Sequence, residues 1–269
     1  MTTLVCWAGV DPHGPTSVYI GSDSRISWKP SRWNLARKLY ASKNSADIFG
    51  FSGKVDLPCH ALGQIVELID AGLFFETSDS FDVRLEAVRK FVYNSYQSLP
   101  KRVSGKFTIV YASRIGVKMN SSFHIGIIKG NSAKQVVAEV LPLPEKSSLV
   151  HRSGSGSSEF RKQYETWVGQ PLENKISTSR AVFGALCESI DSGKDPYTGG
   201  APQLVGLYRS GGNGQSFGVI HKGQRYMYGA LVENGCGINN IQWHNELFEI
   251  CCGETMQVKD KAQRQPKVV

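Results

Sequence analysis

Long apolar runs are missing from this 269-residue sequence, and none approaches the ~20 residues that a membrane-spanning helix needs. The first ten residues also lack a basic segment and a small-residue cleavage site, so we expect no secretory signal. The six cysteines are scattered without the spacing of a disulfide framework, which favours free thiols in a reducing compartment. These absences together predict a cytoplasmic protein.

Signatures of metal binding and of nucleic-acid binding are weak as well. Cys236, His244 and the adjacent pair Cys251 and Cys252 match no standard zinc spacing, so we expect no metal site and no cofactor. The net charge of +8 raises nucleic acid as a partner, but the cations are spread along the chain rather than grouped in a stripe or a recognition motif. We therefore expect a basic surface without a nucleic-acid ligand.

The composition that is present, 41% hydrophobic and 20% charged, is typical of an ordinary globular domain. Apolar periodicity predicts strands, then two helices, strands again, two more helices and closing strands. This order predicts an α+β fold, a four-layer αββα sandwich with two antiparallel sheets between helix pairs. The strands are expected over 2–10, 16–28, 39–41, 48–51, 106–113, 122–130 and 134–143 and in a hairpin over 202–223, and the helices over about 62–73, 85–96, 160–167 and 177–191.

Four short stretches carry candidate chemistry. The segment "MTTLV" places Thr2 directly behind Met1, and "GSDSRIS" places Asp23 and Arg25 on one face of a strand end, since residues two apart share a face. "ARKLY" places Lys38 at the start of an apolar strand. "GFSGK" supplies glycines at a strand-to-helix junction, where backbone N–H groups can hold an anion. Each stretch alone has an ordinary explanation: a surface ion pair, a lysine with a buried stem, or a turn.

Taken in order, these stretches resemble the N-terminal-nucleophile hydrolases, in particular the β-subunits of proteasomes and the related bacterial ATP-dependent peptidase subunit. The resemblance covers residues 2 to about 221, which implies a domain over 1–221 and an extension over 222–269 with a basic tail over about 257–269. The matching segments are Thr2-Thr3-Leu4-Val5, Gly21-Ser22-Asp23-Ser24-Arg25, Arg37-Lys38, Gly50-Phe51-Ser52-Gly53, "GSGS" from Gly154 to Ser157, and "KDPYTGG" with Asp195, Thr198, Gly199 and Gly200.

The resemblance implies that Thr2, freed of Met1, attacks a carbonyl while its own α-amine takes the proton. An α-amine with an ordinary pKa of roughly 7.7–8.0 suits this role far better than a lysine near 10.4. Lys38 would favour the alkoxide, Asp23 would position Lys38, and the Gly53 N–H would stabilise the oxyanion. The other implied roles are Ser155, Asp195 and Thr198 around the amine and its water, Arg25 as support, and Ile26, Ser27, Ala36 and Phe51 as the substrate pocket.

Two departures from the family pattern bear on this site. Thr198 stands where the family has serine and keeps the hydroxyl, while Lys54 follows Gly53 and puts a cation at the mouth of the site. The predicted pocket is mainly apolar, so we expect an apolar preference that Lys54 modifies.

The expected activity is that of a threonine endopeptidase that acts on polypeptides. The resemblance also implies a homo-oligomeric ring and an ATP-dependent unfoldase as partner. Three alternatives stay open at this point: a small-molecule amidase of the same fold, a catalytically silent scaffold subunit, and a cysteine nucleophile created by cleavage before Cys6.

Overall fold

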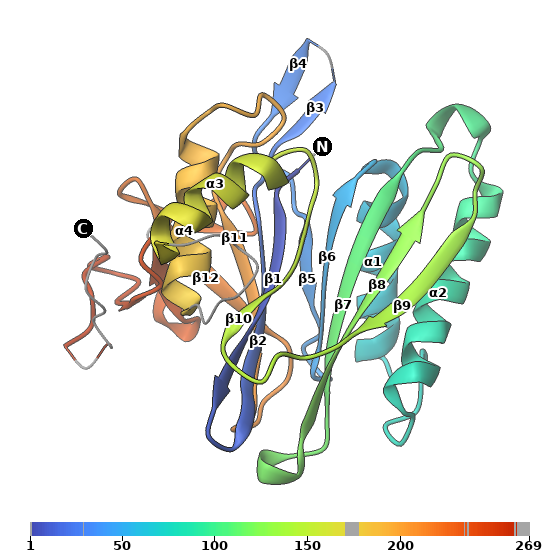
Figure 1. Cartoon of the computed structure of the whole chain (residues 1–269), viewed down its shortest axis with the longest axis horizontal. Helices are drawn as coiled ribbons and strands as arrows, with labels where there is room; N and C mark the ends of the chain where they lie inside the picture. Colours follow the sequence, from blue (N-terminus) through green and yellow to red (C-terminus); the bar gives the residue numbers. More distant parts are fainter. Residues whose placement is uncertain are drawn as a thin grey trace.

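The computed structural model of the chain describes residues 2–28, 30–169, 178–233, 235, 237–260 and 262. Two large, mainly antiparallel sheets lie face to face, and helices cover their outer faces (Figure 1). The predicted α+β class is confirmed. Within these residues, no helix is both long enough and apolar enough to cross a membrane.

The larger sheet has nine strands in the order β10-β1-β2-β11-β12-β13-β14, with β15 added to β12 and β16 to β15. The β12–β15 pair is parallel, and the other pairs in this sheet are antiparallel. The bounds are β1 (Leu4–Asp11), β2 (Gly14–Ser22), β10 (Ser148–Ser153), β11 (Gln203–Tyr208), β12 (Gln215–His221), β13 (Gln224–Met227), β14 (Ala230–Leu231), β15 (Trp243–Asn245) and β16 (Ile250–Cys251).

The smaller sheet has five antiparallel strands in the order β5-β6-β7-β8-β9, and a separate two-stranded hairpin, β3–β4, projects from the end of the molecule where β1 begins (Figure 1). The bounds are β3 (Ile26–Trp28), β4 (Ser31–Trp33), β5 (Leu39–Ala41), β6 (Asp47–Gly53), β7 (Phe107–Ile115), β8 (Ser122–Gly130) and β9 (Val136–Leu141). The helices are α1 (Asp56–Asp70), α2 (Phe81–Ser98), α3 (Ser157–Val168) and α4 (Ser179–Asp191), with short 3₁₀ turns at Lys101–Val103, Lys118–Asn120 and Ile238–Asn240.

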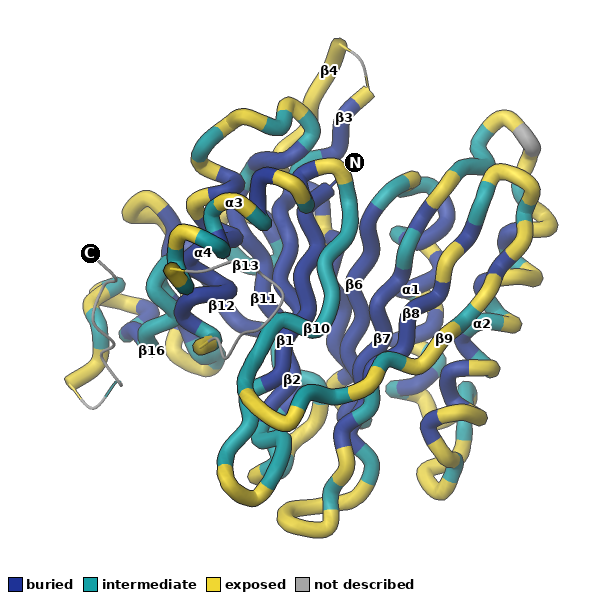
Figure 2. Tube along the Cα trace, in the orientation of Figure 1, coloured by how far each residue is buried: buried dark blue, intermediate teal, exposed yellow. Residues whose placement is uncertain are grey.

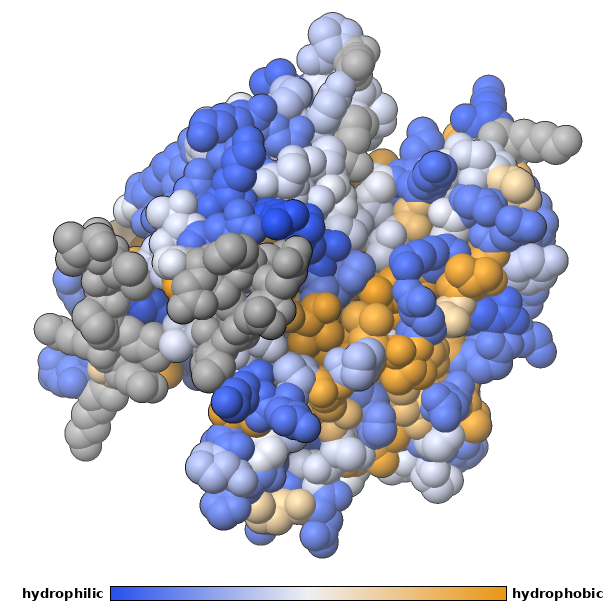
Figure 3. Space-filling view, viewed as in Figure 1, coloured by the Kyte–Doolittle hydropathy of each residue, from blue (hydrophilic) through white to orange (hydrophobic). Residues whose placement is uncertain are grey.

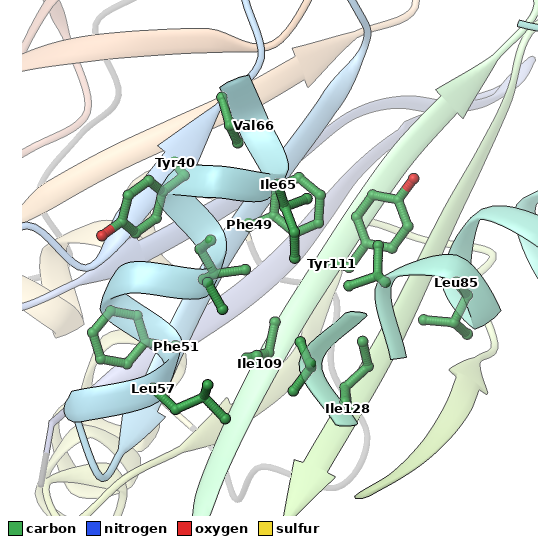
Figure 4. Packing of buried hydrophobic residues seen from close by; sticks show 14 of the residues in the cluster. Tyr40, Phe49, Phe51, Leu57, Ile65, Val66, Leu85, Ile109, Tyr111 and Ile128 are labelled. Carbon is green, nitrogen blue, oxygen red and sulfur yellow. The ribbon is translucent and has the colours of Figure 1, made fainter. Parts of the chain in front are cut away.

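Four apolar clusters hold these elements together, and the smallest of them joins β12, β15 and β16 to the Ile238–Asn240 turn. In the first, α1 and α2 lie on the five-stranded sheet, and Leu57, Ile65 and Val66 of α1 point at Phe49 and other sheet residues (Figure 4). The second cluster fills the space between the two sheets, and the third lies between the nine-stranded sheet and the pair α3 and α4. The strands in the middle are consequently buried along most of their length (Figure 2). Burial on both faces explains why these strands are so rich in apolar residues.

Helix termini follow local sequence signals. Ser80 caps α2 by accepting from the Val83 N–H, and Thr178 caps α4 by accepting from the Ala181 N–H. The predicted start of the first helix was too late, because α1 begins at Asp56, ahead of the first apolar residue used to find it. Its predicted end was too late as well, since α1 stops at Asp70 and Leu73 lies beyond it, 74% exposed.

One predicted strand is broken at a position that matters for the site. The strand expected over 16–28 ends at Ser22, and β3 begins only at Ile26. Asp23 and Arg25 therefore lie in an irregular segment rather than on one face of a strand. Both oxygens of the Asp23 carboxylate accept hydrogen bonds from backbone N–H groups, those of Thr3, Arg25 and Gly199. Strands β4, β10 and β13 to β16 were not predicted at all.

Candidate active site

Segments far apart in the sequence meet at the end of the sheets where β1 begins, beside the β3–β4 hairpin (Figure 1). The backbone links them directly, because the Gly156 N–H donates to the Thr2 carbonyl over 3.2 Å and the Asp23 N–H donates to the Thr3 carbonyl over 3.3 Å. Thr2 is 1% exposed. This end of the molecule brings together Thr2, Asp23, Lys38, Gly53, Ser155, Asp195 and Thr198.

A buried ion pair lies beneath the Thr2 segment. The Lys38 ammonium donates to Asp23 Oδ1 over 2.7 Å, and the two side chains are 1% and 0% exposed. The Thr3 N–H donates to the same oxygen over 3.0 Å, while the N–H groups of Arg25 and Gly199 donate to Oδ2. Four donors thus surround one carboxylate, which holds Lys38 in one position.

Two opposing influences act on Lys38. Burial lowers the pKa of its ammonium, and the neighbouring Asp23 carboxylate opposes that decrease. The Lys38 backbone N–H donates to Gln203 Oε1 over 3.1 Å. The Gln203 amide in turn donates to the carbonyls of Asp23 and Ala36 and to the Ser24 hydroxyl. Gln203 on β11, which the sequence did not indicate, thus connects the segments that carry the ion pair.

A second carboxylate, Asp195, organises the hydroxyl groups on the other side of Thr2. Its Oδ2 accepts from Ser155 Oγ and from Thr198 Oγ1, each over 2.8 Å. The Thr2 N–H donates to Ser155 Oγ over 3.3 Å, and the Thr3 and Thr198 hydroxyls lie 2.9 Å apart. A continuous hydrogen-bond path therefore joins the Thr2 nitrogen to Asp195.

Glycines allow these close approaches. A Cβ on Gly156 would lie 1.9 Å from Thr3 Oγ1 and 2.4 Å from Thr198 Oγ1, so a side chain there would break the hydroxyl network. Gly53 ends β6 with a φ of 96°, and a Cβ on it would lie 2.5 Å from the Lys106 carbonyl oxygen. Both positions therefore require glycine.

A cavity of about 250 Å³ opens beside Thr2. Of the predicted pocket residues, Ile26, Ser27 and Phe51 line it, whereas Ala36 is buried and its carbonyl accepts from Gln203. The lining residues are Thr2, Ile26, Ser27, Trp28, Lys38, Phe51, Gly53, Lys54, Val55 and Lys106. Thr2, the cation of Lys38 and the backbone of Gly53 thus share one accessible space.

Arg25 binds the loop that carries Asp195 and Thr198. Its guanidinium donates to the carbonyls of Pro196 and Thr198 over 3.2 and 2.9 Å, and its Nε donates to Asn34. These contacts connect the segment after β2 to the 195–200 loop.

The environment of Cys6 disfavours a nucleophilic role. Its side chain is 0% exposed within the apolar cluster between the sheets, and its strand is paired on both sides. Burial raises the pKa of the thiol, so the reactive thiolate is strongly disfavoured.

One group of side chains away from this site has the composition of a metal site. The ligand atoms of Asp191, His221 and Glu246 lie within 4.8 Å of one another. However, Lys222 Nζ is 2.7 Å from Asp191 Oδ1, and His221 lies within ion-pair distance of both carboxylates. A metal ion at this point would have to compete with the Lys222 ammonium for Asp191.

The candidate zinc ligands of the C-terminal segment do not meet at one point among the described residues. The His244 ring contacts Gln242 and the Phe248 carbonyl, and Cys251 and Cys252 contact Glu249 and Asn239 respectively. Cys236 lies outside the residues that the structure describes.

A scan against protein-family models matched none of them to this chain, and a search of curated proteins returned no match.

Proposed function

We propose that this chain is a threonine-type endopeptidase in which Thr2, after removal of Met1, is the nucleophile and its own α-amine is the base. The observation that carries the proposal is the buried Lys38–Asp23 pair, because Lys38 and Thr2 line the same cavity. Burying two charges is costly, so an ion pair of this kind at a cavity marks a functional candidate.

The surrounding groups fit the steps of amide hydrolysis. The α-amine of Thr2 takes the hydroxyl proton, and the positive charge of Lys38 favours the alkoxide that attacks the carbonyl carbon. The Gly53 N–H is assigned to the developing oxyanion, a type of contact worth about 3–4 kcal/mol of barrier. Ser155, within hydrogen-bond distance of the Thr2 nitrogen, then orients the amine as it returns the proton to the leaving amine, which breaks the peptide bond and leaves an ester on Thr2. A water molecule that gives a proton to the same α-amine then hydrolyses this ester and restores the Thr2 hydroxyl.

The arrangement of helix pairs on the outer faces of two apposed sheets supports assignment to the αββα sandwich of N-terminal-nucleophile hydrolases. With that assignment come a cytoplasmic location, assembly into a homo-oligomeric ring and an ATP-dependent unfoldase as partner. An apolar area over β8 and β9 supports assembly (Figure 3), since β9 is an edge strand and its Val137 is 61% exposed. The mass of the protein in solution, measured by light scattering, tests this part; a monomer at all concentrations would contradict it.

The central test replaces the nucleophile. Thr2→Ala is expected to abolish hydrolysis of fluorogenic peptides and of a denatured protein with only a small change in the urea unfolding midpoint, because it removes the reacting hydroxyl and one methyl group. Thr2→Ser keeps a hydroxyl and is expected to retain activity. Thr166→Ala, which removes an exposed hydroxyl on α3, is the matched control and should behave as wild type. Full activity of Thr2→Ala would overturn the mechanism.

Two further measurements separate the alternatives. The intact mass of the purified protein reports whether Met1 has been removed, and a retained Met1 would favour the silent scaffold. A threonine-directed covalent inhibitor should add its mass to the N-terminal peptide at Thr2 rather than at Cys6. Cleavage of small amides without cleavage of a denatured protein would favour the amidase.

A further inference from the structure

The charged side chains that line the cavity beside Thr2 are all positive among the described residues. Among the residues that the structure describes, its lining includes three lysines, namely Lys38, Lys54 and Lys106, and no carboxylate. Lys38 is paired with the buried Asp23, and Lys54 lies 3.4 Å from Asp56 across a half-exposed ion pair. Among the described residues, Lys106 has no carboxylate within ion-pair distance.

The two outer lysines are held side by side by the backbone. The Lys54 N–H donates to the Lys106 carbonyl over 2.9 Å, which joins the segment after β6 to the segment before β7. Both residues line the cavity, and both are exposed rather than in the core. An anionic group that enters the cavity is therefore attracted by two neighbouring cations, one of them unpaired by protein carboxylates.

The wall of the cavity carries a second, independent feature. Ser27 is 7% exposed, and its hydroxyl oxygen is buried without a hydrogen-bond partner in the described part of the chain. Leaving a hydroxyl in this state costs free energy, so such groups are normally satisfied. The neighbouring walls are apolar, formed by Ile26, Phe51 and Val55. A fitting ligand consequently has an apolar stem and a polar end.

We propose that this cavity selects substrates with a glutamate side chain immediately before the scissile bond. The proposal rests on the function proposed above and names the substrate class of that site. The methylene groups of glutamate lie against Ile26 and Phe51, and the carboxylate accepts from the Ser27 hydroxyl and faces Lys106 and Lys54. The preference differs from the apolar preference expected from the sequence because Ser27 and Lys106 add polar groups to an apolar pocket.

The experiment compares four fluorogenic peptides that differ only in that residue, which is glutamate, glutamine, leucine or lysine. With the wild-type protein, kcat/KM is expected to be about tenfold higher for glutamate than for glutamine or leucine, and lowest for lysine. Glutamine tests the charge at nearly constant shape, and leucine tests the stem without the polar end. A kcat/KM for leucine equal to or above that for glutamate would overturn the proposal.

Two variants assign the preference to named groups. Lys106→Gln is expected to reduce the glutamate-to-glutamine ratio of kcat/KM several-fold, since it removes a positive charge from the cavity lining. Ser27→Ala is expected to lower both glutamate and glutamine relative to leucine, because it removes the hydroxyl that serves both. Lys90→Gln on α2, the same change of charge outside the cavity, should leave all four rates unchanged.

The outcomes separate this proposal from the one on which it rests. If the wild-type protein cleaves none of the peptides, the peptidase function itself fails. If the wild-type protein cleaves the leucine peptide without a preference for glutamate, and the Thr2→Ala variant does not cleave it, only the proposed specificity is wrong. A glutamate preference that survives both Lys106→Gln and Ser27→Ala would also overturn the assignment.

Discussion

Lys38 beside Thr2 and His244 in the C-terminal segment are both almost completely buried, but their surroundings differ. Lys38 has the Asp23 carboxylate 2.7 Å away, and that carboxylate receives three further N–H bonds. His244 has only neutral hydrogen-bond partners among the described residues: its Nδ1–H donates to the Phe248 carbonyl, its Nε2 accepts from the Gln242 amide, and its ring stacks on Phe248.

The comparison shows what a buried charge requires. Burial lowers the pKa of both side chains, and for His244 it does so without an opposing carboxylate, to about 4. The imidazole is therefore neutral near pH 7, and its hydrogen bonds are those of a neutral ring. At Lys38 the chain instead supplies a carboxylate and the backbone donors to hold that carboxylate. Arg84 and Asp47 form another buried ion pair away from the cavity, so burial of a charge alone does not mark a site. The Lys38–Asp23 pair supports the proposed function because Lys38 lines the same cavity as Thr2.

The largest expected effect on stability comes from removing the Asp23 carboxylate, the partner that Lys38 has and His244 lacks. Asp23→Ala leaves the Lys38 ammonium buried without its partner, and we expect a loss of about 3–5 kcal/mol in the free energy of unfolding. Peptidase activity should be lost with it, because nothing then positions Lys38. Urea unfolding at pH 7 measures the first effect. Asp23→Asn, which keeps the shape and one of the two oxygen acceptors, is expected to destabilise the fold less.

An unchanged unfolding midpoint in Asp23→Ala would contradict the account of Lys38. It would mean that the lysine is neutral in the folded protein, like His244, and that no charge is held beneath Thr2.

The second expected effect concerns His244 and the dependence of stability on pH. The unfolded chain protonates His244 below its ordinary pKa of 6.5, whereas the folded chain does so only near 4. The unfolded state therefore binds more protons in this window, and stability falls as the pH decreases from about 6.5 toward 4, by about 3 kcal/mol for this residue. His151, whose pKa burial also lowers to about 4, adds to the same loss.

Unfolding free energies at pH 7 and pH 4.5 measure this dependence. His244→Gln removes one titrating ring, so the difference between the two pH values should shrink relative to wild type, whatever the variant does to stability at pH 7. An equal or larger difference in the variant would show that His244 is not the group responsible.

Much of the fold was accessible from the sequence because its signals are local. Helical spacing located all four of the described α-helices, and apolar runs located most strands of both sheets. The short strand β10 escaped because its segment, "SLVHRS", is brief and half-buried throughout, and its pairing with β1 passes a change of register between Cys6 and Trp7. Its existence depends on a neighbour 140 residues away rather than on its own pattern.

The site was accessible only where side chains carry recognisable chemistry at recognisable spacing. Asp23 and Lys38 met that condition, whereas Gln203 did not, because one polar residue at the start of an apolar strand is ordinary. Its importance arises from bonds to Asp23, Ala36 and Lys38, which are 165 to 180 residues away in the sequence. Ser27 was identified as a pocket residue, but only the fold reveals that its hydroxyl lacks a partner among the described residues.

The smallest expected effect on stability comes from Asp195, the other carboxylate of the site. Its surroundings differ from those of both Lys38 and His244. It is half-buried, and its partners are two hydroxyls and one backbone N–H rather than a cation. Asp195→Asn keeps the shape and one oxygen acceptor, so we expect a loss of about 1 kcal/mol or less in the free energy of unfolding. The peptidase rate should fall about tenfold, the equivalent of one weakened hydrogen bond, because Ser155 then holds the Thr2 amine less firmly.

Measuring Asp195→Asn and Asp23→Asn in the same assays distinguishes the roles of the two carboxylates in stability and in rate. If Asp195→Asn destabilises the protein as much as Asp23→Asn, the hydroxyl network is as important for folding as the buried ion pair, and the distinction between a charge-holding centre and an orienting centre is wrong. If it lowers the rate while the unfolding midpoint stays within error of wild type, Asp195 acts by orienting the amine, and stability and positioning are divided between the two carboxylates.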